Sequence, residues 1–221
     1  MAWPHPFDLI PVLLQGARVT LEVTLLAAGV ALVLAFVIGL ARLAPFRLIR
    51  FAATVYVEIL RGTSALVQLF YLFFILPLFG IRLDPMATAV VGLGMNLSAY
   101  GSEIVRAAVL NIEAGQWEAA IALSMSPNLA LRRIILPQAL LAMLPPFGNL
   151  LIELLKATSL VSLITLTDLT FAGSTMIAST GRAGQVWGLV LIFYLVMALP
   201  LSWLVRRLEE RLSIYRQPAK A

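Results

Sequence analysis

Residues 19–41 read VTLEVTLLAAGVALVLAFVIGLA, a run in which Glu22 is the only charged side chain. A helix that crosses the hydrocarbon core of a bilayer needs about 20 mainly apolar residues, so this run predicts a membrane-spanning helix. Four further stretches are also mainly apolar and long enough to span, at about 51–78, 86–110, 136–157 and 186–205. The pattern predicts an all-α integral membrane protein with five transmembrane helices.

The composition of the whole chain agrees with this prediction. Of the 221 residues, 61% are hydrophobic and 12% are charged, whereas soluble domains have about 45–50% and about 25%. These values exclude a disordered chain, a fibrous repeat and most soluble enzymes of this length. The chain has no Cys and one His, which excludes disulfides, redox thiols and Cys/His metal sites, so no metal site is predicted.

The basic residues predict the orientation of the five spans. Most of them fall in the 41–50 loop, in the segment between the third and fourth spans, and in the tail: Arg42, Arg47, Arg50, Arg106, Arg132, Arg133, Arg206, Arg207, Arg211, Arg216 and Lys220. The positive-inside rule then places the N-terminus outside and the C-terminus in the cytoplasm. The net charge of +5 is read as topology rather than as a nucleic-acid footprint.

Three regions follow from this topology. Residues 1–16 are predicted to be an extracytoplasmic leader, in which His5 lies between two prolines and no cleaved signal peptide is recognisable. Residues 17–207 form the transmembrane domain, and residues 208–221 form a cytoplasmic tail. Asp84-Pro85 is a helix start before the third span, and Gly62-Thr63-Ser64 is a weak point in the second.

Two connections are patterned rather than simple loops. In the cytoplasmic segment 113–137, residues 116–125 are rich in helix formers, and Ser126-Pro127 is typical of the start of a second helix. The resulting short helix either rests on lipid or forms a docking surface for a cytoplasmic partner. The outer connection 158–184 alternates apolar residues with Ser, Thr and Asp168, and we expect a half-inserted segment that lines a cavity.

The cytoplasmic segment also carries a recognisable motif. Glu118-Ala119-Ala120, then Ser124, Ile134 and Leu136-Pro137, resemble the EAA loop of ABC importer permeases, whose pattern has Gly where this chain has Ser124. The resemblance implies that Glu118 makes a polar contact with an ATPase subunit, while the small Ala119 and Ala120 let the helix sit closely in a groove. Arg132 and Arg133 are expected to pair with acids of that partner or with lipid headgroups.

Other motifs in the same order narrow the resemblance. The chain is similar to the polar amino-acid branch of these permeases (glutamine, histidine, arginine and opine importers) over about residues 12–212, through Glu58-x-x-Arg61-Gly62-Thr63, residues 66–70 (LVQLF), Tyr100-x-x-Glu103-Ile104-Val105-Arg106, residues 115–120 (GQWEAA) and Lys156-x-Thr158-Ser159-Leu160. Ala157 stands where relatives often have an acid, which argues against a cationic cargo. Residues 143–171 resemble permeases for ectoine and hydroxyectoine, the favoured cargo; a general polar amino acid is the alternative.

The resemblance implies a type I ABC importer transmembrane domain in a bacterial inner membrane. The expected partners are a second permease subunit, identical or paralogous, a pair of cytoplasmic ATPase subunits and an extracytoplasmic solute-binding protein. This chain has no P-loop of the G-x-x-x-x-G-K-[ST] type. We therefore predict a transport subunit rather than an enzyme, with no cofactor of its own and with ATP and Mg²⁺ held by the ATPase.

Charged residues inside spans are costly and are functional candidates. Glu58 with Arg61, and Glu103 with Arg106, are three residues apart and are predicted to be structural ion pairs. Glu153 and Lys156 either meet the two ends of a zwitterionic cargo or pair with each other. Further candidates for the lining of the substrate pathway are Thr158, Ser159, Asn96, Tyr100 and Asn149.

Two rival functions come from other classes. An ion-coupled secondary transporter is expected to show more spans or an internal repeat, and neither is evident in this sequence. A membrane enzyme is expected to carry a recognisable nucleophile or metal set, and the single His and absent Cys argue against one.

Overall fold

The computed structural model describes residues 10–213, in which helices are joined by short turns and no strand occurs. The leader residues 1–9, with His5, and the tail residues 214–221 lie outside the described part. The elements are α1 (Ile10–Ala41), α2 (Arg47–Gly62), α3 (Ala65–Phe70), the π-helix η2 (Tyr71–Ile75), the 3₁₀-helix η3 (Leu76–Phe79), α4 (Pro85–Leu110), α5 (Ala114–Ala122), α6 (Pro127–Ala130), the π-helix η4 (Leu131–Ile135), α7 (Leu136–Ala157), the 3₁₀-helix η5 (Thr158–Ile164), α8 (Leu169–Thr180) and α9 (Ala183–Ser213).

Four predicted spans lie within single helices. Helix α7 has the bounds of the fourth, and α4 and α9 contain the third and fifth. Helix α1 contains the first but begins at Ile10, so residues 10–16 belong to a helix rather than to the predicted leader. The physical reason is burial, because Leu13 and Ala17 pack in a cluster with residues of α8 and α9.

The second predicted span, 51–78, is not one continuous helix. The chain bends by 104° between α2 and the segment that begins at Ala65. Thr63, at the break, has extended backbone angles (φ −120°, ψ 156°). The break lies at the weak point that Gly62-Thr63-Ser64 indicates in the sequence, and its freed backbone groups need partners from side chains.

By length and composition, three helical stretches are able to cross a membrane: Ile10–Ala41, Pro127–Ile164 and Ala183–Arg211. The bent pair Arg47–Gly62 and Ala65–Phe79 adds a fourth if it crosses once. Helix α4 is not among them, although it is long. Its small and polar residues, including Gly92, Ser98 and Ser102, are buried against other helices, so α4 faces protein more than lipid.

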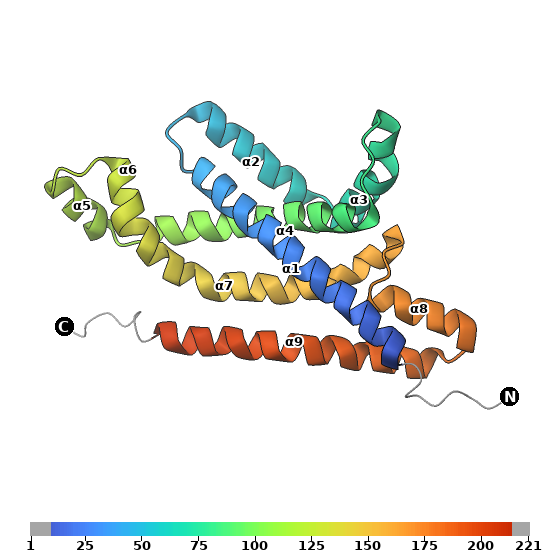
Figure 1. Cartoon of the computed structure of the whole chain (residues 1–221). Helices are drawn as coiled ribbons and strands as arrows, with labels where there is room; N and C mark the ends of the chain where they lie inside the picture. The colour runs from blue at the N-terminus through green and yellow to red at the C-terminus, as the bar shows by residue number, and fades with distance from the viewer. Residues whose placement is uncertain (1–9, 214–221) are drawn as a thin grey trace.

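Helix α1 crosses α4 and α7 diagonally, and α7 and α9 run side by side (Figure 1). The α1–α4 contact is the most extensive one between two elements. It depends on small residues: a Cβ built on Gly39 would lie 2.7 Å from the Cβ of Val105, and one on Gly94 would lie 2.8 Å from a methyl group of Val30. Close approach through glycine is a common way for helices to associate in membranes.

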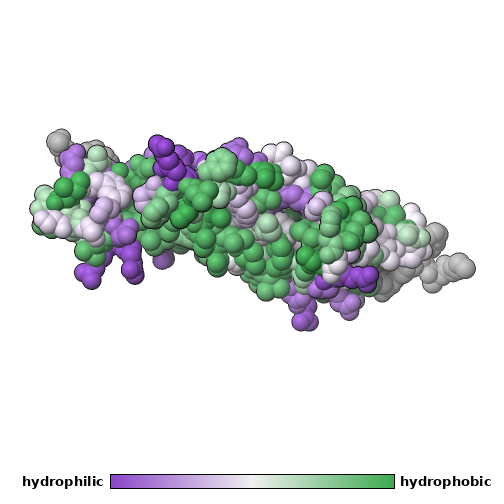
Figure 2. All heavy atoms as spheres, turned by 90° about the horizontal axis from the view of Figure 1, so that it is seen from above, coloured by the Kyte–Doolittle hydropathy of each residue, from purple (hydrophilic) through white to green (hydrophobic). Residues whose placement is uncertain are grey.

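Much of the face shown in Figure 2 is apolar, with hydrophilic side chains gathered in small groups. Large aliphatic side chains on α1 and α9 are exposed, among them Leu25, Val33, Leu191 and Val196. Soluble proteins seldom expose contiguous apolar surface on this scale. The surface therefore fits a chain whose solvent is lipid and neighbouring subunits.

Candidate functional site

Helix α5 is the short helix that the sequence predicts after the third span. It covers Ala114–Ala122, and Ser124 follows in the left-handed region with a φ of 57°. The N–H of Ser124 donates to the Ile121 carbonyl at 2.8 Å, and the N–H of Met125 donates to the Ala120 carbonyl at 3.0 Å. These bonds make a Schellman motif, whose left-handed position is usually glycine, which explains why Gly is the usual residue in the EAA pattern.

One face of α5 is fixed to the rest of the protein. Ala120 is buried, and Trp117 packs against the cluster that α4, η4 and α7 form around Val105. The Nε2 of Gln138, near the start of α7, donates to the Oε1 of Gln116 at 3.2 Å. A displacement of α5 must therefore move the adjoining ends of α4 and α7.

The opposite face of α5 is open. Glu118 and Ala119 are exposed, and Ile121 and Leu123 are 71% and 73% exposed. Two neighbouring aliphatic side chains this exposed, beside one carboxylate, form a surface that favours contact with a protein or with lipid. The helix is thus anchored on one side and available to a partner on the other.

Arg132 and Arg133 lie beyond α5, where they line a shallow pocket with Asn128 and Leu129. Both arginines are exposed, and no acid of the described residues lies within ion-pair distance of either. The expectation that they pair with acids of a partner or with lipid headgroups stays a prediction.

A polar stripe runs along the exposed face of α7. Asn149, Glu153 and Lys156 are all exposed, and their spacing of four and three residues places them on one helix face. No ion pair joins Glu153 to Lys156 in the described part of the chain. The sequence leaves open whether Glu153 and Lys156 pair with each other or contact the cargo. In this structure they do not pair, and both side chains point away from the packed core.

The hydroxyl groups of Thr158 and Ser159, which follow this stripe, donate to backbone carbonyls three residues earlier. Thr158 is buried, and its Oγ1 donates to the Leu155 carbonyl at 2.7 Å. The Oγ of Ser159 donates to the Lys156 carbonyl at 2.9 Å. Thr158, which the sequence predicts as pathway lining, lies in the core in this structure, because the 3₁₀ turn of η5 places it there.

Asn96 belongs to the bend rather than to an open surface. Its Nδ2 donates to the Leu60 carbonyl at 3.2 Å and to the Oε1 of Gln68 at 3.1 Å. The Nε2 of Gln68 donates to the same carbonyl at 2.9 Å. Asn96 was predicted as pathway lining; instead it satisfies a carbonyl that the break after α2 leaves without its helical partner.

The predicted ion pair of Glu58 with Arg61 is not present among the described residues. The guanidinium carbon of Arg61 instead lies 5.3 Å from the ring centroid of Tyr100 in α4, within the range of a cation–π contact. Tyr100 is 39% exposed, so one face of its ring holds Arg61 and part of it remains open.

The other predicted ion pair, Glu103 with Arg106, is present and belongs to a cluster of three charged side chains. Arg106 Nη1 lies 3.1 Å from a carboxylate oxygen of Glu103, and Arg42, just after α1, pairs with the second oxygen. The Arg42 side chain is 11% exposed. Glu103 thus joins the end of α1 to α4, a role that its sequence neighbourhood does not reveal.

Sequence reasoning missed a buried polar cluster at the start of α8. Asp168 is fully buried and accepts hydrogen bonds from the N–H groups of Thr170 and Phe171 at 3.1 and 2.9 Å. The hydroxyl of Tyr194 in α9 donates to Asp168 at 3.5 Å and lies 2.9 Å from the Thr170 hydroxyl. The cap signal was available, since an acid that precedes a helix is typical of an N-cap.

The outer connection therefore differs from the expected cavity-lining segment. It forms η5 and α8, and α8 packs against α1 and α9. The N–H of Leu169 donates to the Oγ1 of Thr20 in α1 at 3.1 Å.

Across residues 10–213, no group of three or more His, Cys, Asp or Glu side chains is arranged to hold a metal ion.

Comparison with known proteins gives a family match over almost the whole chain. The model of the family described as "Binding-protein-dependent transport system inner membrane component" matches residues 16–214. The glutamine transport system permease protein GlnP of Escherichia coli is 40% identical over 96% of this chain and 98% of its own length. A probable amino-acid ABC transporter permease of Sinorhizobium fredii is 43% identical over 91% of this chain and 87% of its own length.

Solved structures agree with the sequence relatives. A chain from the crystal structure of an amino acid ABC transporter with histidines is 34% identical, with a TM-score of 0.88 over 93% of this chain and 96% of that one. A chain of the MetNI methionine ABC transporter in an inward-facing conformation has a TM-score of 0.80 at 20% identity, over 93% of this chain and 98% of that one. The second likeness is one of fold alone.

Proposed function

Because the chain belongs to the family of binding-protein-dependent transport system inner membrane components, we propose that it is the permease subunit of an ATP-driven importer for an amino acid or a similar zwitterion. Relatives at about 40% identity are named as permeases for glutamine and for L-cystine, which supports this class of cargo. A solute-binding protein delivers the cargo outside, and separate ATPase subunits hydrolyse ATP inside.

The observation that carries the proposal is the construction of α5. Its inner face is fixed to α4 and α7 through Trp117 and Gln116, and its outer face presents Glu118 together with the exposed side chains of Ile121 and Leu123. This arrangement suits a lever that an ATPase subunit pushes. ATP binding then shifts a two-state equilibrium between outward- and inward-open bundles, because the ATPase subunits hold α5 in a different position in each state.

We further propose five spans, with the N-terminus outside and the C-terminus cytoplasmic. Helix α4 is long enough to cross, and its polar residues are covered by neighbouring helices, which supports counting it with α1, the bent α2–α3 pair, α7 and α9. Since the chain has no Cys, single-Cys variants at Arg18 and Arg132 test this directly. A membrane-impermeant maleimide is expected to label the first from outside and the second only after the membrane is opened.

For the pathway, the exposed polar stripe of α7 is the best-supported part. Asn149, Glu153 and Lys156 face away from this chain's core, where a second permease subunit, identical or paralogous, would enclose a pathway between the two. One carboxylate and one ammonium suit the two ends of a zwitterion. Among cargoes, ectoine and hydroxyectoine remain the sequence-based preference, while the names of the relatives favour polar amino acids such as glutamine.

The decisive experiment separates this function from an ion-coupled secondary transporter. Uptake of radiolabelled glutamine and ectoine is measured in cells that express the chain with its ATPase and binding protein. We expect uptake of one of them to stop when ATP is depleted with the proton gradient intact, and to continue when a protonophore collapses the gradient with ATP present. The reverse pattern would overturn the proposal.

A further inference from the structure

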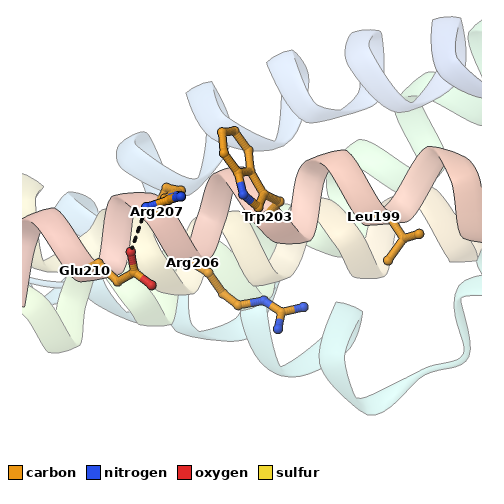
Figure 3. Close-up of a pocket in the computed structure, with 5 residues that line it drawn as sticks. All are labelled: Leu199, Trp203, Arg206, Arg207 and Glu210. Carbon is orange, nitrogen blue, oxygen red and sulfur yellow. Dashed lines mark ion pairs between the residues drawn. The ribbon is translucent and has the colours of Figure 1, made fainter.

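A groove lies on the surface of α9 near its C-terminal end, lined by Leu199, Trp203, Arg206, Arg207 and Glu210. Figure 3 shows Trp203 and Arg207 on one side of the helix and Arg206 on the other, with the Arg206 side chain extended toward Leu199. Neither the α5 lever nor the polar stripe of α7 uses this groove. Its chemistry is mixed, with an aromatic ring, an aliphatic side chain and two cations.

An apolar stripe leads along α9 into the groove. Ile192, Val196, Leu199 and Trp203 are spaced by three or four residues, and each is more than half exposed. The packed side of α9 is a different one, where Val190 and Val205 are buried against α8 and α7. Within residues 10–213 the stripe therefore lies largely outside the packed side of α9, and it has the length and polarity of a lipid-facing surface.

The two arginines at the end of the stripe differ in their partners. The guanidinium carbon of Arg207 lies 5.3 Å from the Trp203 ring centroid, and its Nη1 lies 3.6 Å from a carboxylate oxygen of Glu210. Arg206 is exposed, and none of the acids between residues 10 and 213 lies within 4.0 Å of it. Arg207 is thus held in place by its neighbours, while Arg206 has no counter-ion among the described residues.

We propose that this groove binds the phosphodiester headgroup of an anionic phospholipid, with one acyl chain along the stripe from Ile192 to Trp203. Two arginines and one glutamate leave a single positive charge, which complements one phosphodiester. A guanidinium presents a planar fork of donors that suits phosphate oxygens, and a tryptophan at the end of a spanning helix is typical of the headgroup level. Arg206 supplies the free donors, and Trp203 with Glu210 orients Arg207.

The test uses the fluorescence of Trp203, which is obtained as the difference between the unchanged chain and Trp203→Phe. The full chain, purified with its partner subunits, is reconstituted into phosphatidylcholine bilayers that contain increasing fractions of brominated phosphatidylglycerol or brominated phosphatidylcholine. Brominated chains quench a tryptophan that they touch. We expect phosphatidylglycerol to quench Trp203 at a several-fold lower mole fraction than phosphatidylcholine.

The variants assign this preference to the arginines. Arg206→Gln should weaken it by about fivefold, which corresponds to about 1 kcal/mol for one cation near a membrane surface, and Arg206→Gln with Arg207→Gln should abolish it. Arg206→Lys, which keeps the charge but loses the planar fork, should retain part of the preference. Arg18→Gln replaces an exposed arginine in the N-terminal part of α1 and should leave the preference unchanged. Raised salt should reduce the preference.

Three results would overturn the proposal. The first is equal quenching by both lipids, which would mean that the groove does not select the headgroup charge. The second is a preference that survives the double variant. The third is the absence of quenching by either lipid, which would mean that protein, such as a second copy of the chain, covers the stripe.

Discussion

Arg42, immediately after α1, forms an ion pair with Glu103 of α4, and Arg106 approaches the same carboxylate at 3.1 Å. The Arg42 side chain is 11% exposed. The Glu103 carboxylate, in the C-terminal third of α4 that leads to α5, therefore pairs with two arginines. The pair couples the first span of the chain to the helix that carries the proposed lever.

Glu103→Gln should destabilise the protein, because it leaves the nearly buried Arg42 without a charged partner. A hydrogen bond to a charged group contributes about 1.5–3 kcal/mol, so a clear fall in melting temperature in detergent is expected. Glu22→Gln is the matched control, since its pair with Arg18 is exposed and exposed pairs contribute about 0–1 kcal/mol. Equal melting temperatures for both variants would show that the Arg42–Glu103 pair is not structural.

Ser124→Gly should stabilise the end of α5. Ser124 has a φ of 57°, and a left-handed conformation costs an ordinary residue about 1–2 kcal/mol, which glycine avoids. Hydrogen exchange of the Ser124 and Met125 amides, which hold the Schellman bonds, should slow in this variant and accelerate in Ser124→Val. Faster exchange in the glycine variant would contradict the assigned geometry.

Asp168→Ala should loosen α8, whereas Asp168→Asn should largely preserve it. Loss of an N-cap costs about 0.5–2 kcal/mol, and asparagine caps nearly as well as aspartate. Exchange of the Thr170 and Phe171 amides, which donate to Asp168, reports the change. Thr175→Ala is the control, because its hydroxyl is exposed and bonds only to its own helix. A cap role is excluded if the alanine variant at residue 168 behaves like this control.

Glu153→Gln and Lys156→Met should each change cargo transport while leaving the fold intact, since both side chains are exposed and without an ion pair in the described structure. We expect a higher apparent KM for uptake in both variants. Normal amounts of each in the membrane are the control. Unaltered apparent affinity and rate in both would remove these residues from the pathway.

The features that the sequence predicts well are local ones. Asp84-Pro85 indicates the start of α4, and the Asp84 carboxylate does accept from Met86 and Ala87 N–H groups at 3.2 and 3.3 Å. Ser126-Pro127 likewise begins α6. Such signals involve residues a few positions apart, so they are visible in the sequence itself.

The features that it does not predict join distant parts of the chain. Thr20 and Leu169 are 149 positions apart, and Arg42 and Glu103 are 61 apart. Spacing within one helix predicted a partner for Arg61 on α2, but tertiary packing supplied Tyr100 from α4. Polar side chains in a helical membrane protein find partners on other helices, and only the fold shows which.

The most direct test of the account measures ATP hydrolysis and cargo uptake on the same proteoliposomes, which hold the chain, its ATPase and a cargo-loaded binding protein. Glu118→Lys reverses the charge on the open face of α5. We predict normal insertion and assembly of this variant, with uptake lost and with ATP hydrolysis no longer responsive to the binding protein. Unchanged uptake by Glu118→Lys would contradict the role of α5 as the ATPase contact.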